Sequence, residues 1–589
     1  MKNVYLNLYV FDCTPPENKV VSITNLYELH KDKEDRMSEK EPQFDIIMIG
    51  AGHNGLCCAA YLARAGMKVK ILEQSDHIGG AVITEEVADG FKISPFAYHA
   101  TQLCPQIVQD LELERYGLEM IEKPYRLMSL LPDGRHLCLS HDDEENTREI
   151  SKFSPQDAKT HRKFVSELHE LAALTKNLFE DRVPDITGSI GDIWRMLKAG
   201  HKYRKLSTRQ QEKLHTIFTS SIGDYLDSWF DSQELKGMYA ALALTGNMIH
   251  PYSAGSAFAL IRYYLNKRYK GKSIQVKGGI GNITQSMAKS AMAFGVDIEC
   301  NSTVEKVNMK QFWHHGKEVH QACGVTLEGG QEITARMVVA NCDFATLFTK
   351  LIDGDRFDDM FSRRVKTWRQ GSGSFRVNLA LEKAPEITSL AGIENIESLM
   401  GAHIIIAPSL DYIEQAYRDA RIRGFARNPF LTLDVPTFYD AELAPEGQHI
   451  MHVMAHYFNY DLPDELEWEH ISDEAVDHIL QVIDPIIPSL RDIILHQFSV
   501  SPDDIEKRLH MRRGDIYHGA MHLDQYFTMR PAFGYADYRS PVNNLYMCGA
   551  SNHPGGNVTG LPGRLSAQEM IKDFAHMSDK TNNSDSAGS

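Results

Sequence analysis

The segment from Phe44 to Gly80 constrains the fold more than any other part of the chain. The apolar run Ile46–Ile49 is typical of a parallel strand buried on both faces. The glycine motif of Gly50–Gly55 (G-x-G-x-x-G) follows, then a helix rich in small residues, then a second strand, Lys68–Leu72. This order of strand, glycine turn, helix and strand predicts an α/β fold that begins with a Rossmann-type dinucleotide-binding domain.

Each glycine of the motif has an expected role. Gly50 permits the tight turn, Gly52 lets the backbone approach a pyrophosphate, and Gly55 lets the helix pack close to the sheet. The acid at the end of the second strand stands where a carboxylate accepts hydrogen bonds from a ribose. We expect the neighbours of the glycines to shape the turn rather than to carry out chemistry. The expected dinucleotide contacts are Gly50, Ala51, Gly52, His53, Asn54, Gly55, Leu56 and Glu73.

A second glycine pair favours FAD over NAD as the tightly held cofactor. It stands in His77–Glu86 (HIGGAVITEE), directly after the ribose acid. A nicotinamide-only domain has no need of such a turn, whereas in two-glycine-loop flavoproteins it lets the backbone pass along the ribityl chain and the flavin. The additional expected contacts are Gly79, Gly80 and Ala81.

Composition excludes several function classes. The chain has 589 residues and a net charge of −17, which argues against nucleic-acid binding because that requires a dominant basic face. The nine cysteines form no C-x-x-C motif and show no zinc-like spacing, so we expect neither a disulfide framework nor a redox dithiol. No metal site is expected, because a hairpin loop explains His314, His315 and His320 better.

The chain shows no apolar run of the length that spans a bilayer and no signal or transit peptide, so we expect a cytoplasmic protein. Residues 1–43 are expected to be a disordered arm whose first 36 residues are dispensable, and 578–589 a disordered tail. Two basic stretches, Asp192–Arg209 and Ile261–Lys277, are expected to be solvated faces of packed helices. Contact with an anionic membrane surface is the alternative.

The remaining domains are expected from changes of pattern along the chain. The expected divisions are FAD-binding segments at 44–122, 274–343 and 514–577, a helical insertion at 123–273, and a mixed α+β substrate domain with an antiparallel sheet at 344–513. The insertion contains a long helix that begins after Ser154, with Asp157 three residues on. In the second FAD-binding segment, the backbone of Val304 is placed to bond an adenine edge.

Near the C-terminus, Gly549–Gly563 (GASNHPGGNVTGLPG) joins a strand to a helix. No ribose acid and no following strand complete a second dinucleotide unit there. We therefore interpret this stretch as the flavin-facing half of one FAD site, whose glycines let an aromatic ring system lie flat against the backbone. Its expected flavin contacts are Gly549, Ala550, Gly556 and Val558.

Four segments together resemble one family: GAGHNGLCCAAYLARAG, GGAVITEE, VKGGIGNITQSMA and GASNHPGGNVTGLPGR. They are similar to the phytoene-desaturase-related FAD oxidoreductases, in particular to the carotenoid ketolases and to the group called pyridine nucleotide-disulfide oxidoreductase domain-containing protein 2. The resemblance spans about 44–574. It implies an amine-oxidase-like two-domain fold, bound FAD and oxidation at carbon of an apolar substrate.

The leading hypothesis is a desaturase, dehydrogenase or ketolase that removes hydride from a hydrophobic small molecule such as a polyene, with oxygen or a quinone as electron acceptor. An amine oxidase and an FAD-bound regulatory protein with little turnover are the alternatives. No catalytic acid or base is assigned. The candidates near the flavin turn are Tyr517, His518, His522, Asp524, Arg530 and His553, with His553, Tyr517 and Asp524 retained as catalytic candidates.

Overall fold

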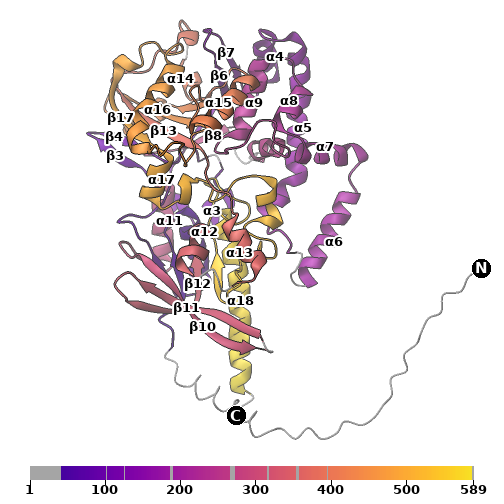
Figure 1. The fold of residues 1–589 in the computed structure, drawn as a ribbon, viewed down its shortest axis with the longest axis vertical. Coiled ribbons are helices and arrows are strands. Elements are labelled where there is room, and N and C mark those ends of the chain that lie inside the picture. Colours follow the sequence, from indigo (N-terminus) through magenta and orange to yellow (C-terminus); the bar gives the residue numbers. More distant parts are fainter. Residues whose placement is uncertain are drawn as a thin grey trace, which may run out of the picture. The chain divides into compact units, whose positions relative to one another are not determined.

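The computed structural model describes residues 41–586, apart from 101, 125, 186–189, 266–271, 315–316, 353–356 and 394–395. The predicted arm at 1–43 therefore lies almost wholly outside the described residues. From Phe44 onward the chain forms one unit built around two large sheets (Figure 1).

The first sheet carries the predicted Rossmann unit, in the lower part of Figure 1. Its strands run in the order β10-β11-β12-β1-β2-β9, with β18 paired to β12. Strands β18, β12, β1, β2 and β9 are parallel, whereas β10 and β11 form an antiparallel hairpin. The bounds are β1 Phe44–Ile49, β2 Val69–Leu72, β9 Asp297–Glu299, β10 Val304–His314, β11 Lys317–Leu327, β12 Glu332–Ala340 and β18 Leu545–Met547.

The second sheet runs in the order β17-β13-β16-β15-β14-β6-β7 and is antiparallel except where β14 pairs with β6. Its bounds are β6 Leu127–Leu130, β7 His136–Leu139, β13 Ser374–Leu381, β14 His403–Ile406, β15 Leu431–Asp434, β16 His449–His456 and β17 Ile494–Val500. Two small sheets pair β3 (Glu85–Ala88) with β4 (Phe91–Ile93) and β5 (Met120–Pro124) with β8 (Lys272–Val276).

The helices pack on both sheets and form a separate helical region. The described α-helices are α2 His53–Arg64, α3 Pro105–Asp110, α4 Asp143–Ser151, α5 Pro155–Glu180, α6 Ile190–Arg204, α7 Thr208–Thr219, α8 Ile222–Asp227, α9 Gln233–Leu244, α10 Ile261–Tyr264, α11 Gly281–Ala293, α12 Phe344–Thr346, α13 Asp359–Lys366, α14 Ile396–Met400, α15 Leu410–Arg423, α16 Trp468–Ile483, α17 Pro502–Leu509 and α18 Leu561–Ser586. Helix α5 begins as predicted, because the Ser154 side chain accepts a hydrogen bond from the Asp157 amide.

Two predicted segments differ from the structure. The helical insertion predicted at 123–273 begins instead with β6 and β7, which join the second sheet, and its helices start at Asp143. The runs LMSL and HLCL are too short to show a period in sequence, and they become strands because β14 supplies a pairing edge. The tail predicted to be disordered from residue 578 is helical to Ser586, because it contains no glycine or proline before that point to end α18.

Helix α6, at the right of Figure 1, is not packed as expected. Its apolar stripe at helical spacing, Ile190, Ile193, Trp194 and Leu197, is exposed, and Asp192 is its only buried residue. The expectation of a packed helix is therefore wrong for the first basic stretch, and its membrane contact stays a prediction. The second basic stretch lies partly outside the described residues and begins in the buried helix α10. Of the described helices, none combines the length and the apolar character that crossing a bilayer demands.

Candidate active site

The first glycine loop leaves the amino end of α2 open. Gly50 has a φ of +97°, and Gly52 caps the helix without any side-chain hydrogen bond, so the backbone amides of the first turn have no internal acceptor. A Cβ at Gly55 would stand 2.4 Å from the carbonyl oxygen of Gly50 and 2.9 Å from the side chain of Asn341. Gly55 therefore packs against the turn itself and against the residue after β12, which refines the expected helix–sheet contact.

Glu73 follows β2 and is buried, with 8 % of its surface exposed. Its carboxylate accepts hydrogen bonds from the amides of Ala51 at 2.7 Å and Ser75 at 3.0 Å. The acid thus ties the first glycine loop to the end of the second strand and still lines the cavity described below. This is the position at which a ribose hydroxyl can donate to a fixed carboxylate.

The second glycine pair lies directly against the first loop. The Gly79 amide donates to the Ala51 carbonyl oxygen at 3.0 Å, and a Cβ at Gly80 would stand 3.4 Å from the Cα of Gly52. Both glycines of the pair have positive φ, which other residues rarely adopt. The two loops therefore form one surface of closely approaching backbone.

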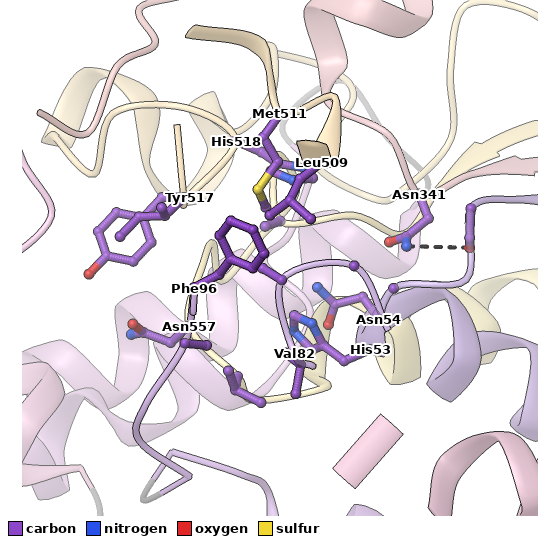
Figure 2. A pocket seen from close by; sticks show the side chains of 18 of the residues that line it. His53, Asn54, Val82, Phe96, Asn341, Leu509, Met511, Tyr517, His518 and Asn557 are labelled. Atoms are coloured by element: carbon purple, nitrogen blue, oxygen red, sulfur yellow. Dashed lines mark hydrogen bonds between the residues drawn. The ribbon is translucent and has the colours of Figure 1, made fainter. Parts of the chain in front are cut away.

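A cavity of about 870 Å³ opens on these loops (Figure 2). The sequence-predicted contacts that line it are Gly50, Gly52, His53, Asn54, Glu73, Gly80, Ala81, Val304, Ala550 and Val558. The predicted contacts that do not line it are Ala51, Gly55, Leu56, Gly79, Gly549 and Gly556. The structure thus brings together residues from the two glycine loops, from the start of β10 and from the C-terminal turn.

Polar atoms without protein partners mark this cavity as a place for a polar ligand. His53 Nε2, Asn54 Oδ1, Tyr98 Oη and His518 Nδ1 are buried, and none has a hydrogen-bond partner among the described residues. Burial is the main cause that lowers the pKa of His53 to about 4 and also lowers the pKa of His518, so both imidazoles are neutral near pH 7. Open helix amides, the Glu73 carboxylate and unpaired polar atoms fit a dinucleotide that spans the cavity.

The C-terminal stretch reaches the cavity, but its glycines have another reason than the one expected. A Cβ would stand 2.8 Å from the Asn341 carbonyl oxygen at Gly549, and 2.3 Å from the Tyr517 ring at Gly556. At Gly563 it would stand 2.1 Å from the carbonyl oxygen of Asn54. The explanation that a flat ring requires these glycines is therefore wrong at these positions, because protein backbone and side chain already occupy the space.

The catalytic candidates divide by position. Tyr517 and His518 line the cavity. Asp524, whose side chain is 55 % exposed, pairs with Arg369 and His522 and does not line it. His553 is fully buried outside the cavity lining, where burial and Arg530 lower its pKa to about 3.

Arg530 has a structural environment rather than a place at the cavity. It is fully buried, and its guanidinium donates to the backbone carbonyl oxygens of Tyr517, Gly519, Ala520, Gln525 and Ala550. It thereby fastens the loop that carries Tyr517 and His518 to the C-terminal turn.

One face of the second sheet supplies cavity residues that the sequence patterns did not single out. Arg376 on β13, Thr432 and Asp434 on β15 and Met454 on β16 line the cavity. The register places Arg376, Met454 and Thr432 in one row across the sheet. The detectable signal is a polar residue at every second position of otherwise apolar core strands, as in SFRVNLAL and LTLD.

Within the described part of the chain, no group of three or more His, Cys, Asp or Glu side chains is arranged to hold a metal ion. His320 lies within strand β11 rather than in a loop, His314 ends β10, and His315 lies outside the described residues.

The chain matches known proteins over most of its length. It is 31% identical over 558 residues to "Pyridine nucleotide-disulfide oxidoreductase domain-containing protein 2" of Rattus norvegicus, covering 91% of this chain and 95% of that protein. It is 26% identical to one of the polypeptides of the limonene dehydrogenase of Castellaniella defragrans, covering 91% and 96%, and 25% identical to "Phytoene desaturase (lycopene-forming)" of a Paracoccus species, covering 90% and 97%.

A solved structure of redesigned putrescine oxidase has the same fold, with a TM-score of 0.57 at 15% identity over 91% of this chain and 99% of that one. Residues 55–571 match the family described as flavin containing amine oxidoreductase. The expected amine-oxidase-like fold, the flavin cofactor and the phytoene-desaturase relationship are thereby confirmed. The chain belongs to the flavin containing amine oxidoreductase family and is a flavin-dependent oxidoreductase.

Proposed function

We propose that this protein uses bound FAD to remove hydrogen from carbon of a largely apolar small molecule. The observation that carries the proposal is the continuity of the cavity. The same cavity that is lined by both glycine loops and Glu73 also extends between Phe96, Leu242, Met454, Leu509, Met511 and Ile516. Apolar side chains with a few polar groups are typical of sites for small organic substrates. The named activities of the limonene dehydrogenase and the phytoene desaturase support this substrate class.

The chain's own residues divide the work of holding the cofactor. Gly50, Gly52 and the open amino end of α2 would bind the pyrophosphate, and Glu73 the adenosine ribose. Val304 would contact the adenine, whereas Gly80, Ala81, Ala550 and Val558 would flank the remainder. When bound, FAD supplies the acceptor for a hydride equivalent. Reoxidation by oxygen or a quinone is part of the proposal.

His518 is the best-placed residue to take up the proton that leaves with the hydride. It lines the cavity, and its Nδ1 has no partner among the described residues. Its backbone carbonyl oxygen accepts hydrogen bonds from Trp368 Nε1 at 3.0 Å and Ser551 Oγ at 2.9 Å, which hold the residue in place. A neutral imidazole with a free ring nitrogen can act as a general base.

An amine substrate is disfavoured by the charges at the cavity. Lys123, Arg262 and Arg376 line it, and Asp434, the acid beside Arg376 on the second sheet, is already paired with Lys123. A protonated amine would meet uncompensated positive charge there, which costs binding energy at short range. Oxidation at carbon without an amine therefore fits the cavity better.

Anaerobic stopped-flow mixing of the holoenzyme tests the proposal. A monoterpene or polyene should bleach the oxidised flavin absorbance, whereas aliphatic amines and NADPH should not. His518→Gln should slow bleaching by about 10²–10⁴-fold, the usual effect of removing a general base, while Asp524→Asn, outside the cavity, should not. Rapid bleaching by amines alone would refute the proposal.

A further inference from the structure

The second sheet separates its apolar and polar residues onto opposite faces. Phe375, Val377 and Leu379 of β13 pack in the core that includes α16. The alternate residues Arg376 and Asn378 lie on the other face, together with their register partners on β16 and β15. The polar face is almost fully buried: the partners that share it are Thr432, Asp434, His452, Met454 and His456, each at most 6 % exposed. Only a cavity or its contents can account for polar groups buried on this face.

Arg376 is the unusual member of this face. It is 2 % exposed, it lines the cavity, and its Nε has no hydrogen-bond partner among the described residues. None of the ion pairs found in the described part of the chain includes it. Its guanidinium carbon lies 5.1 Å from the centroid of the Tyr98 ring, whose hydroxyl is also buried without a partner. An arginine buried without a carboxylate partner costs several kcal/mol by general experience, so its presence requires compensation.

The surrounding groups do not provide that compensation. Asp434 lies on the same face but is paired with Lys123, with 3.5 Å between Nζ and Oδ1. His403, His452 and His456 are neutral, because burial lowers the pKa of His452 to about 4 and those of the other two to about 3. Burial raises the pKa of Tyr98 to about 12, so its hydroxyl remains a donor near neutral pH. The charges on this side of the cavity therefore sum to an excess of positive charge.

From this arrangement we infer that the substrate carries a carboxylate, which binds Arg376 with the help of the Tyr98 hydroxyl. The inference rests on the proposed function, since it names the end of the substrate that is not oxidised. A planar guanidinium with free donors matches a carboxylate in two parallel hydrogen bonds, and a phenol can donate a third. The apolar side chains of the same cavity would then hold the remainder of the molecule.

Titration of the oxidised holoenzyme with decanoate, methyl decanoate and decylamine, followed by perturbation of the flavin absorption spectrum, tests this without turnover. Decanoate should bind at least about tenfold more tightly than the ester or the amine, as expected for charge-assisted hydrogen bonds. Arg376→Met should abolish that preference and leave ester binding unchanged. Tyr98→Phe should reduce it by a smaller factor. Arg421→Met on the exposed side of α15 is the matched control and should change nothing.

Three outcomes would overturn the inference. The first is a wild-type protein that binds decanoate no more tightly than its ester, or not at all. The second is an Arg376→Met protein that keeps the preference. The third is loss of FAD from a folded Arg376→Met protein, which would assign the arginine to the cofactor. If Arg376→Met does not fold, Arg376→Lys takes its place and should weaken decanoate binding selectively. Because binding is read without oxidation, failure of the proposed reaction leaves these results interpretable.

Discussion

The contact between Gly563 and the first glycine loop offers a sharp test of how the two halves of the site are joined. Gly563 lies in the first turn of α18, and a Cβ there would stand 2.1 Å from the carbonyl oxygen of Asn54 and 3.0 Å from its carbonyl carbon. Asn54 is in the first turn of α2 and lines the cavity. The substitution Gly563→Ala thus presses the C-terminal helix against the loop that is proposed to bind the pyrophosphate.

The size of the effect follows from that geometry. Ordinary van der Waals contact begins at 3.4 Å, so the two helices must separate by more than an ångström, and backbone cannot rotate away as a flexible side chain would. Overpacking of this kind costs about 1–3 kcal/mol, from which the higher helix propensity of alanine recovers up to about 1 kcal/mol. We expect Gly563→Ala to lower the free energy of unfolding by about 1–2 kcal/mol.

Gly200 is the matched control. It lies in helix α6 with no atom within 4 Å of its added Cβ, so Gly200→Ala changes only helix propensity. That variant should be stabilised by about 0.5–1 kcal/mol, or be unchanged if α6 unfolds separately. Urea unfolding followed by circular dichroism gives the stability, and release of flavin fluorescence reports the cofactor site. Equal stability of Gly563→Ala and wild type would refute the reasoning from close backbone contact.

Three further predictions concern charges and hydrogen bonds. Glu73→Gln should raise the dissociation constant of FAD about ten- to hundredfold in a fluorescence titration, because the amide cannot accept from both backbone donors; unchanged affinity would exclude the role. Arg530→Lys should destabilise the protein by about 3 kcal/mol in thermal unfolding, since one ammonium cannot satisfy five carbonyl oxygens, and a smaller loss than 1 kcal/mol would count against this. Acid should destabilise the fold: the pKa of His403 and of His456 is lowered from 6.5 to about 3, so below about pH 6.5 the unfolded state takes up protons that the folded state does not, and each histidine loses about 2 kcal/mol of stability between about pH 7 and 5. Urea unfolding at several pH values should show this slope, His403→Asn should flatten it, and an unchanged slope in that variant would contradict the assignment.

The local elements were largely predictable because their signals lie close together in sequence. The strand at Ile46–Ile49, the glycine turn and Glu73 form one continuous pattern, and the structure contains β1, α2 and β2 at these positions. The Ser154 cap and the apolar strands of the second sheet were likewise visible, since capping and alternation are properties of a few consecutive residues.

The tertiary structure alone decided which distant segments meet. Strand β6 pairs with β14 from a different part of the chain, which moved 127–139 from a predicted helical region into the second sheet. The glycines of the C-terminal turn face Asn341, Tyr517 and Asn54, contacts that no local pattern shows.

The polar face of the second sheet is the clearest case. The alternation in SFRVNLAL shows that β13 has one polar face, but sequence cannot tell whether that face meets solvent, another element or a ligand. Only the pairing of β13, β16 and β15, closed over by the helical region, buries Arg376 at the cavity away from any free carboxylate. Sequence therefore determined the flavin-binding architecture, whereas the chemistry of the substrate side depends on long-range strand register, which local residue preferences do not encode.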